Sequence, residues 1–265
     1  MKHSRLGFGI VGALEIATVR DIAARAEEIG IHSLWVNDTP GGNSLERLEA
    51  AAAVTTRLHL GTGVIAVDRK PAKAIVAEVA ARNLPLDRLT IGIGSAAKPS
   101  PLGRIRENLA ILRETLAAPV VVGALGPRMR QLGAEASDGL LFNWLTPQYA
   151  LETTQEMREF ATAAGNSGAQ SATYIRTALG TDALPVLEEE AARYSGFPAY
   201  AANFARLGIT AMETSVHADT AEGIVEGIVA FDGAVDHAVV RAITPNHDLV
   251  HYLRLLDAIA PLAAN

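Results

Sequence analysis

The sequence predicts a closed (β/α)8 barrel, the TIM barrel of the α/β class, on three observations. Short apolar runs typical of strands alternate with amphipathic helical stretches from one end of the 265-residue chain to the other. Eight such pairs can be counted, and the stretches between them that are rich in Pro and Ser are only of loop length. Because one barrel of this type occupies about 250 residues, we expect residues 1–265 to form a single domain.

The expected strands are apolar runs bounded by polar residues or glycine. They span residues 6–11, 33–37, 58–66, 89–94, 119–123, 139–143, 173–179 and 237–243. The expected helices carry apolar residues at intervals of three and four. They span residues 18–30, 45–56, 72–83, 104–116, 127–137, 147–165 and 247–260. A longer helical excursion, at about 180–232, separates the seventh strand from the eighth.

Composition bounds the class of protein. Apolar residues make up 49% of the chain and charged residues 20%, which favours a large buried core over disorder. No apolar run has the roughly 18 residues of a membrane span, and the start of the chain lacks the regions of a signal peptide. The net charge of -6 argues against a nucleic-acid partner. The absence of cysteine fits a reducing compartment, so we expect a cytoplasmic protein without a membrane partner.

Gly7, Gly9 and Gly12 spell G-x-G-x-x-G, the pattern of a dinucleotide-binding turn. Such a turn follows a buried strand, but only a short polar segment precedes Gly7. We therefore place these glycines inside the first strand. There they let a cofactor or a neighbouring backbone approach, or they leave room for bulky side chains inside the barrel.

The carboxyl ends of the strands, where a TIM barrel places its chemistry, carry the most distinctive segments. In chain order these include "AEEIGIHSLWVND", "RLHLGTGV" and "GALGPRMRQLGAEASDGLLFNWLTP". Their order and spacing resemble the bacterial luciferase-like superfamily, specifically its class of oxidoreductases that use the deazaflavin coenzyme F420. The resemblance covers essentially the whole chain. It implies hydride transfer between coenzyme F420 and a small organic substrate. The alternative is an FMN-dependent luciferase-like monooxygenase or reductase, because FMN and F420 both carry a ribityl phosphate.

The segment after the fifth expected strand is a candidate phosphate site. A proline suits the first turn of a helix, whose free N–H groups and dipole attract an anion. The resemblance implies that the backbone of this segment, with donors from Gly126, Arg128 and Met129, holds the ribityl phosphate. The alternative is an ordinary strand-to-helix turn without a ligand. The residues of this candidate site are Gly123, Ala124, Leu125, Gly126, Pro127, Arg128 and Met129.

Gly63 and Val64, near the end of the third expected strand, are further candidate cofactor residues. The resemblance implies a non-proline cis peptide between them, which bulges under the central ring of the coenzyme. Such a peptide occurs where the surrounding structure enforces it, typically at a functional site. The alternative is a regular strand in which the glycine makes space for a neighbour.

Asp38 and Asn143, at the ends of the second and sixth expected strands, are the candidate catalytic residues. Asp38 either caps a helix on the rim or forms a hydrogen bond to the coenzyme ring, as the resemblance implies. Thr39 stands where some relatives that oxidise sugar phosphates have a histidine base, so their acid–base chemistry does not transfer. The Asn143 amide is expected to fix a carbonyl or hydroxyl group. Gly94 and Ser95 let the ring or its ribityl chain approach the backbone.

The mouth of the barrel is expected to be open, because no long insertion follows the fourth or fifth strand. We therefore expect a bulky or extended substrate, unless the excursion closes the mouth as a lid. Trp144 either walls the pocket or packs in the core. The aromatic residues of the excursion recur near helical spacing, which favours the core of a helical pair or a dimer face. They are Tyr194, Phe197, Tyr200 and Phe204.

Two further features follow from the resemblance. Members of the superfamily commonly form homodimers through the early helices of the barrel, and the alanine-rich segment 48–56 permits close helix packing. The acidic tail of F420 favours cationic residues on the rim of the site. The candidates are Arg69, Lys70, Lys98 and Arg128, although exposed lysine and arginine usually only solvate a surface.

Two functions from other classes remain open. His247 and His251 lie one helical turn apart in the last expected helix, a spacing compatible with a metal-dependent hydrolase. No glutamate of the zinc-protease pattern and no obvious third ligand accompany them, which favours solvated or capping histidines. A barrel that binds a flavin without catalysis is the other alternative.

Overall fold

The computed structural model describes residues 3–39, 41–95 and 100–263 of the chain. Eight parallel strands close into a barrel, as the sequence predicts. The barrel strands are β1 (Arg5–Val11), β2 (Ser33–Asn37), β3 (His59–Thr62), β5 (Leu89–Gly94), β6 (Val120–Gly123), β7 (Gly139–Asn143), β8 (Gln170–Leu179) and β10 (His237–Ile243). Because every pairing is parallel, all eight strands end at the same mouth.

Strand β10 closes the barrel by pairing with β1 on one side and β8 on the other. Val239 of β10 lies opposite Gly7 of β1 and opposite Tyr174 of β8. Gly7 and Gly9 lie within β1, as the sequence predicts, and Gly12 directly follows this strand. A Cβ atom on Gly9 would lie 3.0 Å from the ring of Tyr174, so these glycines leave room for large side chains inside the barrel.

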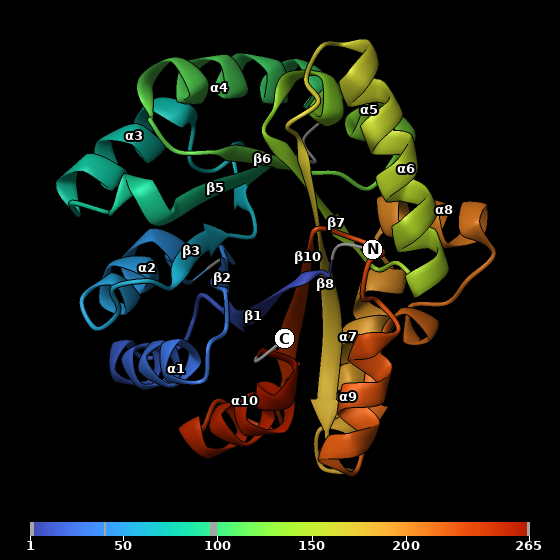
Figure 1. Ribbon diagram of the computed structural model, residues 1–265. Coiled ribbons are helices and arrows are strands. Elements are labelled where there is room, and N and C mark those ends of the chain that lie inside the picture. Colours follow the sequence, from blue (N-terminus) through green and yellow to red (C-terminus); the bar gives the residue numbers. More distant parts are fainter. Residues whose placement is uncertain (1–2, 40, 96–99, 264–265) are drawn as a thin grey trace.

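Helices surround the strands (Figure 1). They are α1 (Ile16–Glu28), α2 (Ser44–Ala52), α3 (Ala72–Ala81), α4 (Pro101–Thr115), α5 (Pro127–Ala136), α6 (Pro147–Ala163), α7 (Leu184–Ser195), α8 (Pro198–Leu207), α9 (Ala221–Val229) and α10 (Leu249–Ala263). Their starts follow local chemistry. Asn43 and Thr146 cap α2 and α6 with side-chain oxygens, and Pro127 and Pro198 begin helices whose first N–H groups have no intrahelical partner.

The core has two layers. The larger layer lies between the strands and the surrounding helices and includes Phe8, Leu34 and Ile91, all fully buried. The smaller layer fills the barrel itself and is built around Trp35, with Val121, Leu141, Tyr174 and Val239 among its other members. The alternation of residues along each strand sends one set outward and the other inward, so inward residues near the strand ends line the mouth.

Three details differ from the sequence prediction. The third expected strand divides into β3 and a short β4 (Ile65–Ala66), with Gly63 and Val64 between them. The excursion contains α7, α8 and α9 but also a short strand, β9 (Val216–Ala218), which pairs with the end of β8. The last helix begins at Leu249 rather than at residue 247, so His247 precedes it. Within the described ranges, no helix combines the length and the apolar character that crossing a bilayer requires.

Candidate active site

The strand ends bring most of the predicted site residues to one mouth. Asp38 follows β2, Asn143 ends β7, and Gly94 and Gly123 end β5 and β6. Ser95 follows Gly94, and the residues from Ala124 to Met129 lead into the first turn of α5. Lys98, predicted on the rim, lies outside the described residues.

The peptide bond between Gly63 and Val64 is cis, as predicted. The side chain of Val64 lies against two residues that have no side chain, because a Cβ atom on Gly94 would be 2.7 Å from its Cγ2 and one on Gly123 would be 3.1 Å from its Cγ1. Asn37 donates a hydrogen bond from Nδ2 to the Gly63 carbonyl over 2.5 Å. Residues from three strand ends therefore form one continuous surface.

Both carboxylate oxygens of Asp38 have partners within the chain. Oδ1 accepts hydrogen bonds from the backbone N and the hydroxyl of Ser44, at 3.1 and 3.0 Å. Oδ2 pairs with the guanidinium of Arg69 at 2.6 Å, and the Asp38 side chain is only 5% exposed. These contacts fit the interpretation of Asp38 as a rim carboxylate at the start of α2. Arg69, one of the predicted rim cations, serves as its partner.

Lys70 and Ser95, two further predicted site residues, also have partners in the chain. Lys70 pairs with Glu78 at 2.6 Å. The Ser95 hydroxyl donates to the carboxylate of Asp68. Arg128 is exposed at the start of α5.

The start of α5 leaves backbone donors open. Its N-terminal capping residue is Gly126, which has no side chain and therefore cannot cap the first N–H groups of the helix. The N–H of Met129 donates to the Gly126 carbonyl at 3.1 Å, whereas the N–H groups of Gly126 and Arg128 make no hydrogen bond to a described residue. A Cβ atom on Gly126 would meet nothing within 4 Å. Open space therefore lies beside the free donors at the positive end of a ten-residue helix.

Asn143 belongs to a charged network inside the mouth. Its Oδ1 accepts a hydrogen bond from Arg176 of β8 at 2.5 Å. Arg176 donates from Nε to Glu190 of α7 at 2.7 Å. Arg241 of β10 donates from Nε to Oδ1 of Asn37 at 2.6 Å and lies 4.0 Å from Glu190. The network thus joins four barrel strands, β2, β7, β8 and β10, to the helical excursion.

Burial and the neighbouring positive charges shift the pKa of Glu190 in opposite directions. Burial alone would raise the pKa of this carboxyl, but the nearby guanidinium groups of Arg241 and Arg176 outweigh burial and hold the pKa below its ordinary value. Glu190 is therefore ionised at neutral pH, and its side chain is only 12% exposed.

The aromatic residues of the excursion form a packed cluster over this network. The Arg176 guanidinium lies 3.6 Å from the ring centre of Trp144 and 4.9 Å from that of Tyr194. Trp144 also contacts Phe204 edge to face, and Tyr194 contacts Tyr200 in the same way. The helical-pair prediction is confirmed for Tyr194, Tyr200 and Phe204, whereas Phe197 is exposed. The pair contacts Trp144 after β7 and Arg176 of β8.

Sequence reasoning missed Arg176, Glu190, Arg241 and Tyr174. A signal was present for the strand residues, because Tyr174, Arg176 and Arg241 occupy inward positions of expected strands. When a charged residue in an apolar strand stands at a position that faces the inside of the barrel, its charge is buried and needs a partner. Glu190 carries no such signal, since it lies among consecutive glutamates of a helix.

The metal-site alternative finds no support in the described residues. Across residues 3–39, 41–95 and 100–263, no group of three His, Asp or Glu side chains could hold an ion. His247 lies before α10 and its Nδ1 is 3.2 Å from the hydroxyl of Tyr252. The predicted helical pairing of His247 with His251 is therefore wrong, because the helix begins two residues after His247.

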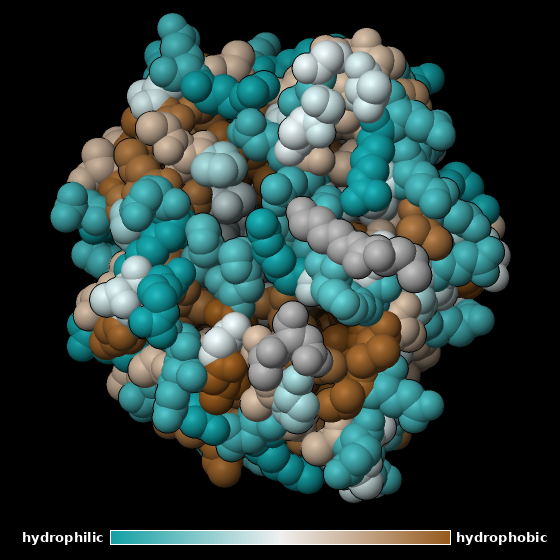
Figure 2. Space-filling model, viewed as in Figure 1, coloured by the Kyte–Doolittle hydropathy of each residue, from teal (hydrophilic) through white to brown (hydrophobic). Residues whose placement is uncertain are grey.

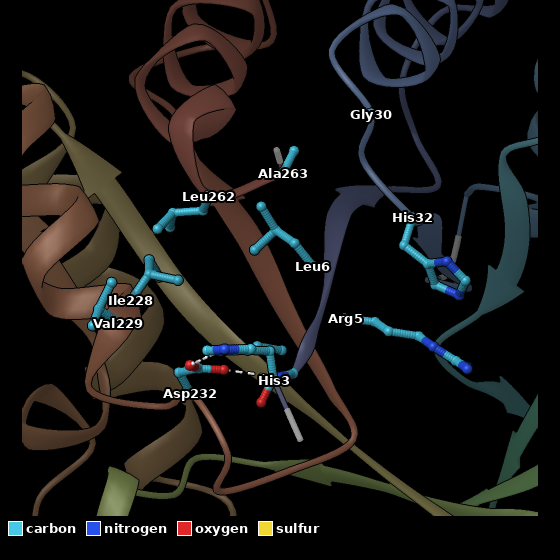
Figure 3. A pocket seen from close by; sticks show the side chains of 12 residues that line it. His3, Arg5, Leu6, Gly30, His32, Ile228, Val229, Asp232, Leu262 and Ala263 are labelled. Carbon is cyan, nitrogen blue, oxygen red and sulfur yellow. Dashed lines mark hydrogen bonds and ion pairs between the residues drawn. The ribbon is translucent and has the colours of Figure 1, made fainter. Parts of the chain in front are cut away.

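A cavity of about 730 Å³ lies at the opposite, amino-terminal end of the barrel. Figure 3 shows Arg5 and His32 on one side of it and Ile228, Val229 and Leu262 on the other. Figure 2 shows hydrophobic surface in the lower half of the face, over the region where α9 and α10 lie in Figure 1. This cavity is remote from the predicted site residues, so it is not part of the candidate active site.

Comparisons with known proteins identify relatives by sequence. A protein of Mycobacterium tuberculosis named as a coenzyme F420-dependent oxidoreductase is 24% identical, over 81% of this chain and 75% of its own length. The 5,10-methylenetetrahydromethanopterin reductase of Archaeoglobus fulgidus is 26% identical over 46% of this chain and 48% of its own length.

Solved structures share the fold. One is an F420-dependent secondary alcohol dehydrogenase, solved with an F420–acetone adduct. Its alignment with this protein covers 100% of both chains, with a TM-score of 0.79 and 17% identity. A type II Baeyer–Villiger monooxygenase of Pseudomonas putida, solved with FMN, covers 96% of both chains with a TM-score of 0.71 and 14% identity. The family described as luciferase-like monooxygenase matches residues 5–232, and the chain belongs to this family.

Proposed function

We propose that the protein is an F420-dependent oxidoreductase that transfers a hydride between the deazaflavin and a small organic substrate. The observation that carries the proposal is the surface formed by Val64 against Gly94 and Gly123, beside the open donors of α5. A flat ring needs backbone that it can approach closely, and its phosphate needs N–H donors. The named relatives support F420, and the FMN-bound neighbour keeps FMN as the alternative coenzyme.

The residues present fit such a coenzyme. The free N–H groups of Gly126 and Arg128 would hold its phosphate, and Val64 would back its ring. When bound, the deazaflavin supplies the ring carbon that accepts or donates the hydride. The protein then has to orient the substrate and exclude water. Asn143, held by Arg176, presents an amide at the mouth for a substrate carbonyl or hydroxyl group.

A titration with F420 and with FMN tests the assignment. Ring fluorescence is followed as purified protein is added, and saturable binding of F420, tighter than that of FMN, is expected. If FMN binds saturably and F420 does not, the coenzyme is FMN rather than F420. If neither coenzyme binds, the proposal fails.

Gly126→Ala tests the phosphate position. The added methyl group meets no protein atom within 4 Å, so the fold should be unaffected, but it occupies the space beside the donors. We expect F420 affinity to fall about tenfold or more, because charge-assisted hydrogen bonds would lengthen. Gly168→Ala is the matched control, since its Cβ atom also meets nothing and it lies just before β8 at the other end of the barrel. Equal affinity in both variants would contradict the phosphate assignment.

We further propose that the protein acts in the cytoplasm as a homodimer on a small-molecule substrate. The absence of cysteine supports a reducing compartment, and the net charge of -6 supports a substrate other than nucleic acid. Of the alanines expected at the dimer contact, Ala50 and Ala51 are buried within the chain, whereas Ala53 and the neighbouring Val54, just after α2, are exposed. A contact near α2 would therefore use its carboxyl end.

A further inference from the structure

The mouth of the barrel contains two buried guanidinium groups. Arg176 is 3% exposed and Arg241 is 6% exposed, and both are inward residues of barrel strands. We call them the guanidinium pair. Both face the carboxylate of Glu190, Arg176 through a hydrogen bond of 2.7 Å and Arg241 at 4.0 Å.

The guanidinium pair has more positive charge than its surroundings neutralise. Within the described ranges, no ion pair of 4.0 Å or less joins either arginine to a carboxylate other than Glu190. Arg193, which is exposed, lies 3.7 Å from Glu190 and adds a further positive charge. The remaining hydrogen bonds of the pair go to neutral groups, Asn37, Asn143 and the Ala242 carbonyl. Buried charges are normally paired, so one positive charge here calls for an anion.

Two polar atoms beside the guanidinium pair have no partner among the described residues. The hydroxyl of Tyr174 and the indole N–H of Trp144 are buried and make no hydrogen bond. Tyr174 is 3% exposed, and its hydroxyl lies against Gly63, where a Cβ atom would be only 1.9 Å from it. Burial raises the pKa of the Tyr174 hydroxyl, although Arg241 and Arg176 oppose the shift, so it remains a donor. Both atoms are donors that an anion would satisfy.

The strand ends around the guanidinium pair are accessible. Asn37, Val64, Gly123 and Asn143 are each partly exposed, although Trp35 and Tyr174 beneath them are buried. A ligand that reaches these strand ends therefore meets the guanidinium pair next. The aromatic rings of Trp144, Tyr194 and Tyr200 beside it provide an apolar wall.

We propose that the guanidinium pair receives the carboxylate of the substrate, and that the substrate is an organic acid with an apolar or aromatic body. This inference rests on the proposed oxidoreductase function, whose coenzyme would occupy the surface at Val64. Glu190 is a positioning residue: it orients Arg176 and sets the net charge of the site.

Benzoate is the probe, and benzyl alcohol is its neutral counterpart of similar shape. The chain has two tryptophans, so the Trp35→Phe background leaves Trp144, which stacks on Arg176, as the fluorescent reporter. The titration is made with and without bound F420. We expect saturable quenching by benzoate. Benzyl alcohol should bind at least about tenfold more weakly, because it lacks the charged carboxylate that hydrogen-bonds to the guanidinium pair. Equal binding of the two probes overturns the proposal.

Variants test whether the affinity for benzoate depends on the net charge of the site. Arg241→Gln should weaken benzoate by about tenfold or more, whereas Glu190→Gln should tighten benzoate severalfold because it raises the net charge. A merely structural role of Glu190 would instead weaken binding. Arg158→Gln, which removes a half-exposed arginine paired with Asp236 at the amino-terminal end of the barrel, is the matched control and should change nothing. Thermal unfolding of each variant shows that it is folded.

The outcomes separate this inference from the proposed function. If F420 binds to the wild-type protein but benzoate does not, the organic-acid substrate is wrong and the proposed oxidoreductase remains. If Arg241→Gln weakens F420 by as much as it weakens benzoate, the positive charge serves the coenzyme and the inference is again overturned. If benzoate binds and responds to the variants but F420 does not bind, the acid site stands and the proposed coenzyme falls.

Discussion

Three histidines meet at the amino-terminal end of the barrel, where the strands begin. The rings of His32 and His59 stack with centres 4.6 Å apart, and the ring of His237 lies 5.4 Å from His32. Burial, together with a smaller effect of the neighbouring His237, His59 and Arg5 side chains, lowers the pKa of His32 from 6.5 to about 4. His32 is therefore neutral in the folded protein at pH 7.

This depressed pKa predicts a loss of stability in mild acid. The folded pKa of His32 lies below its unfolded value, so the unfolded chain binds more protons between pH 6.5 and pH 4. The contribution is fully present above pH 6.5 and is lost as the pH falls to about 4. Allowing for the part of the ring that water screens, we expect a decrease of about 1 to 2 kcal/mol in the free energy of unfolding.

Urea unfolding at several pH values between 4 and 7.5 measures this decrease. The His32→Asn variant should show a shallower dependence on pH, whereas His251→Asn, on α10 and outside the cluster, should follow the wild type. An unchanged pH dependence in His32→Asn would show that another group is responsible.

At the scale of elements, the α7–α8 pair is held to the barrel by two kinds of contact. Glu190 of α7 bonds to Arg176 of β8, and Phe204 of α8 packs on Trp144 after β7. Outside this cluster the pair is largely exposed, including Phe197 at 47%. The aromatic contacts therefore attach α8, whereas α7 has a second apolar attachment through Leu187, which is fully buried with Ala178 and Ile243.

Phe204→Ala should loosen α8 more than the barrel. Phe204 is 6% exposed, and the loss of a buried phenyl ring costs about 3 kcal/mol. Hydrogen exchange should increase first in residues 184–207, with little change in β1 or β10. Leu151→Ala on α6, which is 41% exposed, is the control and should have little effect. Uniformly faster exchange throughout the barrel would contradict a local attachment.

The sequence predicts the barrel strands well because each is a continuous apolar run between turns. The starts of β1, β5, β7 and β10 lie within one residue of expectation. Strand β9 was missed because three residues beside the end of β8 show no periodicity. The division of the third strand was implied by resemblance alone, since a glycine within a strand has several structural explanations.

The candidate site was predictable only where barrel geometry determines it. Residues at the ends of strands, such as Gly94 and Asn143, were found because all parallel strands end at one mouth. The partners of Asp38 depend on the loops before α2 and α3, whose paths the sequence does not specify. Likewise, Glu190 reaches Arg176 only because α7 folds back over the mouth.

At the scale of the whole molecule, exposed residues rather than core residues determine whether two chains associate. Val54 is 41% exposed at the carboxyl end of α2, next to the region expected to form a dimer contact. Sedimentation analysis should give twice the 27.9 kDa of one chain, and Val54→Glu should shift the species toward one chain because a charge would be buried in the contact. A single-chain mass for the wild type at micromolar concentration would contradict the homodimer.

The two ends of the described chain lie together. His3 and Ser4 line the same amino-terminal cavity as Leu262 and Ala263, at the face opposite the mouth. An affinity tag or a surface tether fused at either end would therefore project away from the ligand entrance. Protein anchored in this way on a sensor chip should still admit coenzyme from solution, and a short peptide joining the two ends should yield circularly permuted chains that keep the entrance intact.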